Sequence, residues 1–141
     1  MHLLDVNVLI ARADSSHPHH AAAAAWMAKH ASSGWATCPI TENGMLRILG
    51  QPSYPGGPGS PEAALVTFRS ILAIPGHRFL PDDISLATSL GSLQGISPAQ
   101  LTDVYLLALA IHHGVSFLSL DRRMNLALVP GGKSAYVQLP V

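Results

Sequence analysis

The chain has 141 residues, of which 48% are hydrophobic and 11% charged, and its formal net charge is zero. This length suits one domain with a real core, and the composition excludes a disordered or acidic-tail protein. The neutral balance also excludes a strongly basic nucleic-acid footprint, so any nucleic-acid binding must use local charge.

Cysteine content and hydropathy narrow the class further. The single cysteine, Cys38, excludes an intramolecular disulfide and a zinc site built from several cysteines. No apolar run approaches the roughly 20 residues that span a bilayer. The first apolar stretch has no Lys or Arg before it and is interrupted by Asp5, which argues against a signal peptide. We therefore expect a soluble cytoplasmic protein with a single domain over residues 1–141.

The first half of the chain alternates strand and helix patterns. Pro18 suits the first turn of an alanine-rich helix that Gly34 ends. Thr41 is expected to cap the next helix, although Gly44 weakens that prediction. The stretch GQPSYPGGPGSP, at 50–61, is a loop on composition and is long for a compact domain. Strands are expected at 2–5 and 35–39, and helices at 6–13, 17–32, 41–49 and 61–73.

The second half continues the alternation. Its clearest element is a helix that Pro98 starts and Gly114 ends, and it is apolar almost all round, so we expect it to be buried. Asp82 or Asp83 is expected to cap a helix at 82–91. Strands are expected at 77–81, 115–120 and 134–140, with one helical turn at 122–128. The alternation predicts an α/β fold with three α/β/α layers and a central, mainly parallel sheet.

Four acidic residues occupy positions that this fold brings to one edge. Asp5 and Asp121 end predicted strands, Glu42 starts the helix after the second strand, and Asp103 lies in the first turns of the buried helix. Strand ends and the helix starts that follow them share the edge at which α/β proteins bind ligands. Converging carboxylates repel one another but are tolerated around Mg²⁺ or Mn²⁺, which prefer oxygen ligands. Such a centre suits phosphodiester hydrolysis.

Each acid also has a purely structural interpretation. Asp5 and Asp121 could cap the elements that follow them, and Glu42 could interact with the helix dipole. Asp103 is harder to explain in this way because its neighbours are apolar, although a buried pair with an arginine is an alternative.

The motifs around these acids carry a family resemblance. The stretches LLDVNVLIA, TENGMLRIL, LTDVYLLALAIHHG and FLSLDRRM resemble those of PIN-domain proteins, and within that group those of the VapC toxins of toxin–antitoxin pairs. The resemblance covers essentially the whole chain. It implies a PIN-like fold and a Mg²⁺- or Mn²⁺-dependent endoribonuclease that acts on RNA. It also implies a homodimer and a cognate antitoxin that blocks the site within a hetero-oligomer.

The resemblance also implies roles for particular residues. Asp5 and Asp103 would be the principal metal ligands, Glu42 would assist or orient the attacking water, and Asp121 would act through water. Three further residues would support these acids by hydrogen bonds: Asn7, Thr102 and Ser119.

Basic residues and histidines suggest further contacts. Arg47, Arg122 and Arg123 are candidates to hold RNA phosphates, and ordinary solvated charge is the alternative. The eight histidines raise the question of a zinc site, which the absence of HExxH spacing and of further cysteines disfavours.

Two other functions compete with catalysis by metal-activated water. One is a PIN-like module that binds RNA or protein without cutting, and the complete set of four acids argues against it. The other is phosphotransfer through an aspartyl nucleophile, which needs a nearby lysine. Only Lys29 and Lys133 exist, and neither follows an apolar strand as that chemistry requires.

Overall fold

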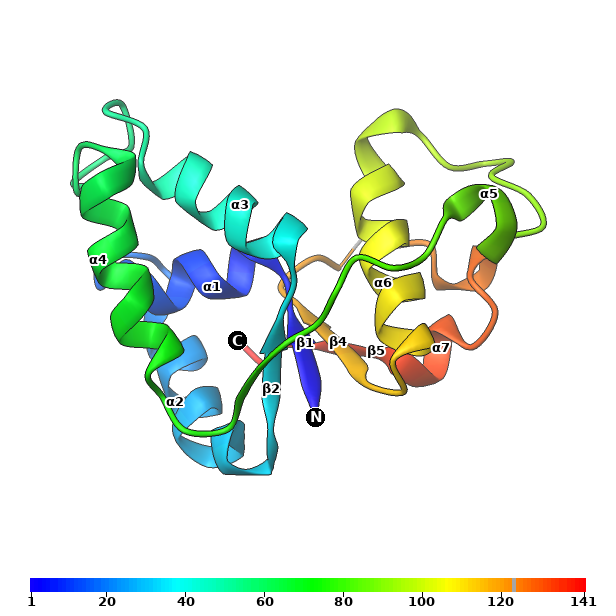
Figure 1. Cartoon of the computed structure of the whole chain (residues 1–141), viewed down its shortest axis with the longest axis horizontal. Coiled ribbons are helices and arrows are strands. Elements are labelled where there is room, and N and C mark those ends of the chain that lie inside the picture. The colour runs from blue at the N-terminus through cyan, green and yellow to red at the C-terminus, as the bar shows by residue number, and fades with distance from the viewer. Residues whose placement is uncertain (123) are drawn as a thin grey trace.

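The computed structural model describes residues 1–122 and 124–141, which form a five-stranded sheet with helices on both faces (Figure 1). The strands are β1 His2–Leu4, β2 Trp35–Thr37, β3 His77–Phe79, β4 Ser116–Ser119 and β5 Tyr136–Gln138. The helices are α1 Val6–Ala13, α2 His20–His30, α3 Pro39–Leu49, α4 Pro61–Leu72, α5 Leu86–Ser89, α6 Leu101–His112 and α7 Gly132–Ala135. Short 3-10 turns lie at η1 Ala31–Ser33, η2 Pro98–Gln100 and η3 Leu126–Leu128.

The sheet has the strand order β3-β2-β1-β4-β5, and each neighbouring pair of strands is parallel. β1 is central, with Leu3 paired to Ala36 of β2 on one side and to Phe117 of β4 on the other. The strands that follow β1 are added first on one side and then on the other. Connections therefore diverge at the carboxyl ends of β1 and β4, and this is where such sheets form a crevice. The predicted parallel sheet is confirmed.

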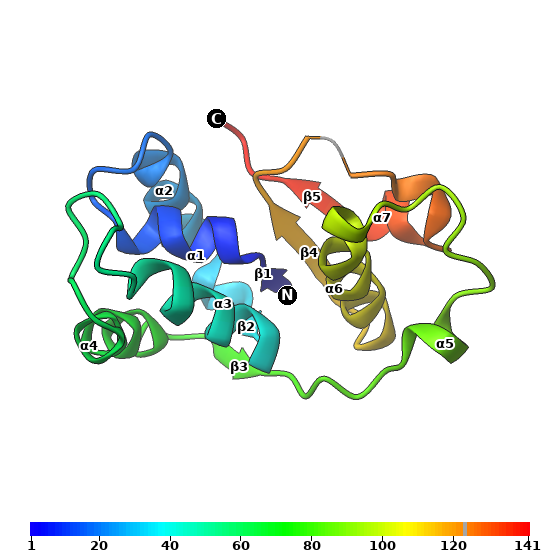
Figure 2. The same ribbon diagram turned by 90° about the horizontal axis from the view of Figure 1, so that it is seen from above.

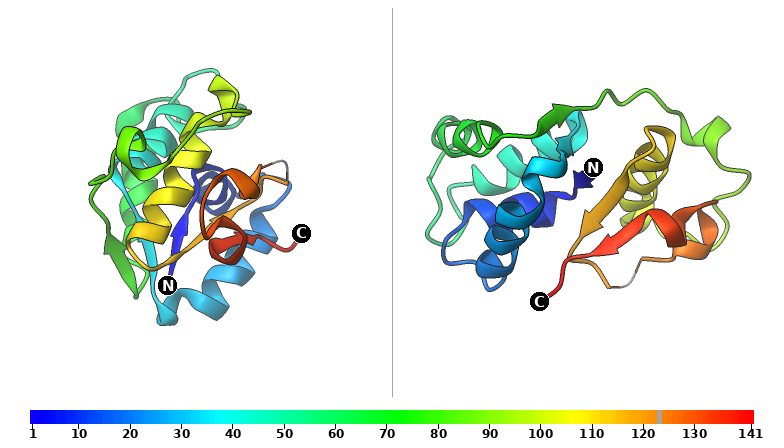
Figure 3. Two further views of the ribbon diagram at one scale, coloured as in Figure 1. Left: turned by 90° about the vertical axis from the view of Figure 1, so that its right-hand side faces the viewer. Right: turned by 90° about the horizontal axis from the view of Figure 1, so that it is seen from below.

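Two separate cores hold the layers together. Leu4 packs in the core beneath α1 to α4, whereas Leu3 packs in the core beneath α6. Adjacent residues of a strand point to opposite faces, so the two leucines before Asp5 serve one core each. Figure 2 and Figure 3 show α1 to α4 on one side of the sheet and α6 and α7 on the other. The predicted α/β/α arrangement is thereby confirmed.

Several local predictions are wrong at helix starts. Pro18 lies in a turn, and α2 begins two residues later at His20. Cys38 rather than Thr41 is the N-cap of α3, because Pro39 already takes the first helical position. The hydroxyl of Thr41 instead accepts a hydrogen bond from the backbone N–H of Cys38 at 3.0 Å.

The helix predicted at 82–91 is reduced to one turn. Ser85 caps it, and its hydroxyl accepts a hydrogen bond from the N–H of Ala87 at 3.3 Å. Asp83 does not cap this helix. Its carboxylate instead lies 2.8 Å from Nε2 of His113 at the end of α6. The helix α7 directly before β5 was not predicted.

Helices α1 and α3 approach closely because Gly44 has no side chain. A Cβ atom at Gly44 would lie 2.8 Å from Cγ2 of Val6, closer than Cβ atoms approach other atoms in proteins, so Val6 or one of the helices would have to shift. Val6 directly follows Asp5, so this contact fixes α3 against the end of β1. The glycine that weakens the helix prediction is therefore required by the packing.

The Gly/Pro-rich segment is a loop, as predicted, and it is anchored to α1. The hydroxyl of Tyr54 donates a hydrogen bond to Oδ2 of Asp14 at 2.7 Å, and Asp14 caps the C-terminal end of α1. None of the helices in the described ranges is both long and apolar enough to cross a membrane.

Candidate active site

Asp5 stands between a strand and a helix and is almost fully buried. It follows β1 directly and is the N-cap of α1, where its Oδ1 accepts a hydrogen bond from the N–H of Val6 at 2.7 Å. Only 5% of the residue is exposed. Burial raises the pKa of the Asp5 carboxyl, and the charge of Asp121 adds to this effect while hydrogen bonds oppose it. Capping and a role in a charged site are therefore compatible in the same side chain.

The hydroxyl of Ser119, the last residue of β4, connects the groups around Asp5. It donates to Oδ2 of Asp5 at 2.6 Å and accepts from Nδ2 of Asn7 at 3.1 Å and from the N–H of Asp121 at 3.0 Å. Oδ1 of Asn7 in turn accepts from the N–H of Leu120 at 3.1 Å. Ser119 is fully buried, so these bonds hold the ends of β1 and β4 in one arrangement.

Three carboxylates meet in an open cleft of about 480 Å³ at this edge of the sheet. Asp5, Asp103 and Asp121 line the cleft, together with Asn7 and with apolar residues of α1 and α3, including Ile48. Burial, and then the charges of Asp5 and Asp121, raise the pKa of Asp103 to about 6. Such mutual repulsion is the condition that a divalent cation relieves.

Two helices begin at the cleft and contribute their positive ends. Asp5 caps α1, and Asp103 lies in the first turn of α6. The N-terminal end of a helix presents N–H groups and a partial positive charge, which favour anions such as phosphate. The cleft thus combines carboxylates that suit a cation with helix ends that suit a phosphate.

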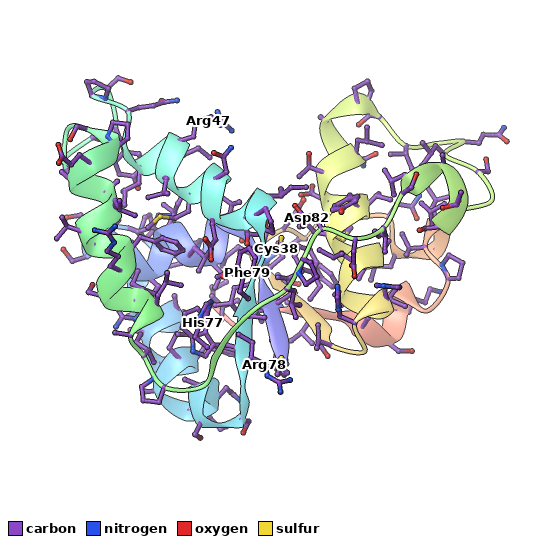
Figure 4. All side chains as sticks on the ribbon, in the orientation of Figure 1. Cys38, Arg47, His77, Arg78, Phe79 and Asp82 are labelled. Carbon is purple, nitrogen blue, oxygen red and sulfur yellow. The ribbon has the colours of Figure 1, made fainter. Side chains whose placement is uncertain are left out.

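Glu42 does not line this cleft. Its Oε1 accepts a hydrogen bond from the hydroxyl of Thr37 at 2.6 Å, and that hydroxyl also lies 2.8 Å from Nε2 of His77. Burial lowers the pKa of His77, although the charge of Glu42 opposes the shift. His77 lies on the edge strand β3, and Figure 4 shows it below Cys38 at the start of α3. The structure therefore holds Glu42 toward β2 and β3.

The remaining candidate residues lie outside the cleft. Thr102, Arg47 and Arg122 are exposed, and Figure 4 shows Arg47 on α3 at a distance from β3. Arg123 lies outside the described residues. Cys38 is no nucleophile, because burial raises the pKa of its thiol to about 11.

Tyr136 is a residue at the site that the sequence did not single out. It lies in β5, and its hydroxyl donates a hydrogen bond to the backbone carbonyl of Asp121. Burial raises the pKa of Tyr136, and the charges of Asp121, Asp5 and Asp103 contribute. The phenol therefore lies beside the acidic cleft, at the backbone of Asp121. An aromatic residue in the last predicted strand gave no signal of this contact.

The fold and this acidic edge define a PIN domain. A family model described as PIN domain matches residues 2–127, and the chain belongs to this family. Within this family, the chain is 38% identical over 137 residues to Ribonuclease VapC44 of Mycobacterium tuberculosis, and the aligned region covers 96% of each chain. It is 43% identical over 122 residues to Ribonuclease VapC38 of the same species, with 86% of this chain and 85% of the relative covered. Ribonuclease VapC39, also from that species, is 40% identical over 121 residues, or 84% of this chain and 87% of the relative. The chain is thus a member of the VapC group, and the resemblance is confirmed.

Proposed function

We infer that this protein is an endoribonuclease and the toxin of a type II toxin–antitoxin system, with its active site in the cleft of Asp5, Asp103 and Asp121. The observation that carries the proposal is the convergence of three carboxylates from distant parts of the chain in one open, partly apolar cleft. A structural role alone leaves this repulsion unexplained. The three relatives named as ribonucleases support the same reaction.

The donor set fits a divalent cation that prefers oxygen ligands. Asp5 and Asp103 would hold Mg²⁺ or Mn²⁺ directly, and Asp121 would act through water. When bound, the metal supplies an activated water and stabilises the leaving oxygen. Ser119 and Asn7 keep the carboxylate of Asp5 oriented. The N-terminal ends of α1 and α6 favour the phosphate of the RNA.

The role proposed for Glu42 requires a local rearrangement. Its carboxylate would have to exchange its hydrogen bond with Thr37 to assist a metal or orient a water in the cleft. Arg47 lies on α3 directly before Ile48, which lines the cleft, and Arg122 directly follows Asp121. We propose that these arginines, with Arg123, contact RNA phosphates by charge-assisted hydrogen bonds.

The remaining assignments extend from the family. We propose that residues 1–141 act as one catalytic domain in the cytoplasm, as a homodimer that a cognate antitoxin inhibits within a hetero-oligomer. Whether Mg²⁺ or Mn²⁺ serves in the cell depends on supply as well as affinity, because affinity for divalent metals does not by itself select the ion.

Removal of divalent metal tests the proposed function directly. Purified protein is expected to cut structured RNA in the presence of Mg²⁺ or Mn²⁺ and to lose this activity in EDTA, with recovery on adding excess metal. The cleavage products are resolved on a sequencing gel. Activity that persists in EDTA contradicts the mechanism. Absence of both cleavage and Mn²⁺ binding by calorimetry favours the non-catalytic binding module.

Replacing Tyr136 with phenylalanine is expected to slow cleavage by about tenfold. The change removes the hydrogen bond to the carbonyl of Asp121, so the carboxylate of Asp121 is less well placed. The apparent affinity for Mn²⁺ should fall as well, which mere loss of stability does not cause. The matched control is Tyr54→Phe, which removes a tyrosine hydrogen bond to Asp14 outside the cleft. Equal activity and Mn²⁺ affinity in the two variants contradict a positioning role for Tyr136.

A further inference from the structure

A second group of potential metal ligands lies at the opposite end of α6. Asp83 comes from the segment after β3, and His112 and His113 come from the C-terminal end of α6. Oδ1 of Asp83 lies 2.8 Å from Nε2 of His113 and 3.6 Å from Nε2 of His112. The two imidazole rings are nearly perpendicular, at 83°, with centroids 5.0 Å apart. Both rings therefore direct a nitrogen toward the same carboxylate.

We propose that Asp83, His112 and His113 form a zinc site that is separate from the acidic cleft. One ligand atom from each of the three residues lies within 4.8 Å of the other two. Zinc binds imidazole nitrogen and carboxylate oxygen at about 2.0–2.2 Å, so tetrahedral ligands lie about 3.3 Å apart. The distances from Asp83 to the two histidines already bracket this value. Small side-chain rotations would complete the set, and water would take the fourth position.

The chemistry of this group distinguishes it from the acidic cleft. Two imidazoles and one carboxylate suit Zn²⁺, whereas the all-oxygen set of Asp5, Asp103 and Asp121 suits Mg²⁺ or Mn²⁺. Asp103 and His112 lie nine positions apart on one helix, which places the two sites about 14 Å apart along its axis. One ion at each site is therefore sterically possible.

Accessibility and anchoring both favour metal entry. The side chains of Asp83 and His112 are 45% and 51% exposed, so a hydrated ion reaches them without unfolding. His113 is only 18% exposed, and its Nε2 also lies 3.2 Å from the carbonyl oxygen of Pro81. The low exposure of His113 limits its movement while the other two ligands adapt, and metal binding would replace the contact of its Nε2 with the Pro81 carbonyl. On binding, each Nε2 gives its lone pair to the metal, and any proton it carries leaves to solvent or moves to Nδ1.

Such an ion would add a cross-link between α6 and the segment before it, which otherwise meet through apolar side chains such as Leu90. The segment between β3 and α6 contains only the single turn of α5 and a 3-10 turn, and most of its residues are exposed. Zinc would attach its start, at Asp83, to the end of α6. The bound state would be stabilised in proportion to metal occupancy, and the segment would resist proteolysis.

Calorimetric titration of tag-free, full-length Asp103→Asn protein with Zn²⁺ tests the proposal, because that background weakens binding in the acidic cleft. We expect one Zn²⁺ per chain, lower susceptibility of residues 84–97 to limited proteolysis, and a visible Co²⁺ spectrum typical of tetrahedral coordination. His112→Ala should weaken Zn²⁺ binding by about tenfold or more. His19→Ala removes a histidine from outside the group and should leave binding unchanged.

The outcomes separate this site from the proposed nuclease. Equal Zn²⁺ affinity in the Asp103→Asn protein with and without His112→Ala overturns the proposal. Failure of the Asp103→Asn protein to bind at millimolar Zn²⁺ overturns it as well. In that case the group is an ordinary ion pair between Asp83 and the histidines. The exposed His112 is expected to be replaceable without loss of folding, which circular dichroism checks. In the wild-type background His112→Ala should cut RNA normally with Mg²⁺, so a failure of zinc binding leaves the nuclease assignment untouched.

Discussion

Replacing Asp103 with asparagine is expected to abolish RNA cleavage while making the metal-free protein more stable at neutral pH. The cleavage rate should fall by about 10³-fold or more, because a carboxylate that holds the metal is lost. Stability should rise although activity falls, because burial and repulsion from neighbouring acids both disfavour the ionised carboxylate of Asp103. Burial and the charges of Asp5 and Asp121 raise its pKa to about 6 from 3.8.

The pH dependence of stability follows from this raised pKa. Between the two pKa values the native state holds a proton that the unfolded chain releases, so the metal-free wild type loses stability as pH rises from about 4 through 6. Asparagine carries no charge and escapes this loss. Allowing for solvent screening, we expect the variant to be more stable by about 1–2 kcal/mol at pH 7.5 and equally stable at pH 4. Thermal unfolding at the two pH values in EDTA measures both effects.

Two controls test whether the effects of Asp103→Asn come from the acidic cleft. Glu62→Gln removes a negative charge at the exposed start of α4 and should change neither cleavage nor the pH profile of stability. Adding Mn²⁺ should stabilise the wild type more than the Asp103→Asn variant. A variant that is destabilised at pH 7.5 in EDTA would mean that Asp103 makes a favourable interaction in the native state.

Asp5→Asn and Asp5→Ala are both expected to be inactive, and the alanine variant should be the more destabilised of the two. Asparagine is as good an N-cap as aspartate and keeps an oxygen for the N–H of Val6. Alanine removes the cap, at a cost of about 1–2 kcal/mol. Both variants remove the acceptor of the buried Ser119 hydroxyl, because the NH2 group of asparagine takes the place of Oδ2, and this costs each of them about 1 kcal/mol or more.

Chemical denaturation and RNA cleavage separate these two roles of Asp5. Asp14→Asn is the matched control, since it changes a partly buried carboxylate at the other end of α1, outside the cleft, and should keep the activity. If Asp5→Asn cuts RNA at the wild-type rate, Asp5 is a helix cap alone and the metal centre is wrong. If Asp5→Ala is as stable as Asp5→Asn, the capping hydrogen bond is energetically unimportant.

The grouping of Asp5, Asp103 and Asp121 could be anticipated because it depends only on the order of elements. Strand ends and helix starts share an edge in any parallel α/β layer, whatever their residue-level details. A supporting role for Ser119 was expected only from the family resemblance, and its hydrogen bonds to Asp5, to Asn7 and to the N–H of Asp121 required coordinates.

The direction of Glu42 could not be anticipated because it depends on where α3 begins and how it is rotated. Capping by Thr41 was expected, but the helix begins at Pro39, two residues before that position. The rotation is then fixed by the contact between Gly44 and Val6, which no local pattern encodes. Tyr136 was missed for a related reason: its reach to Asp121 follows from the pairing of β5 with β4.

The hydrogen bond between Asp5 and Ser119 joins residues 114 positions apart. During translation the N-terminal residues leave the ribosome first, at about 5–20 residues per second, and pairing between distant segments is the slow part of folding. A nascent chain that has exposed α1, α3 and even α6 still lacks the strand that orients Asp5. The site can therefore form only after β4 has been made and inserted beside β1. Synthesis of the chain and the onset of its activity are thereby separated in time.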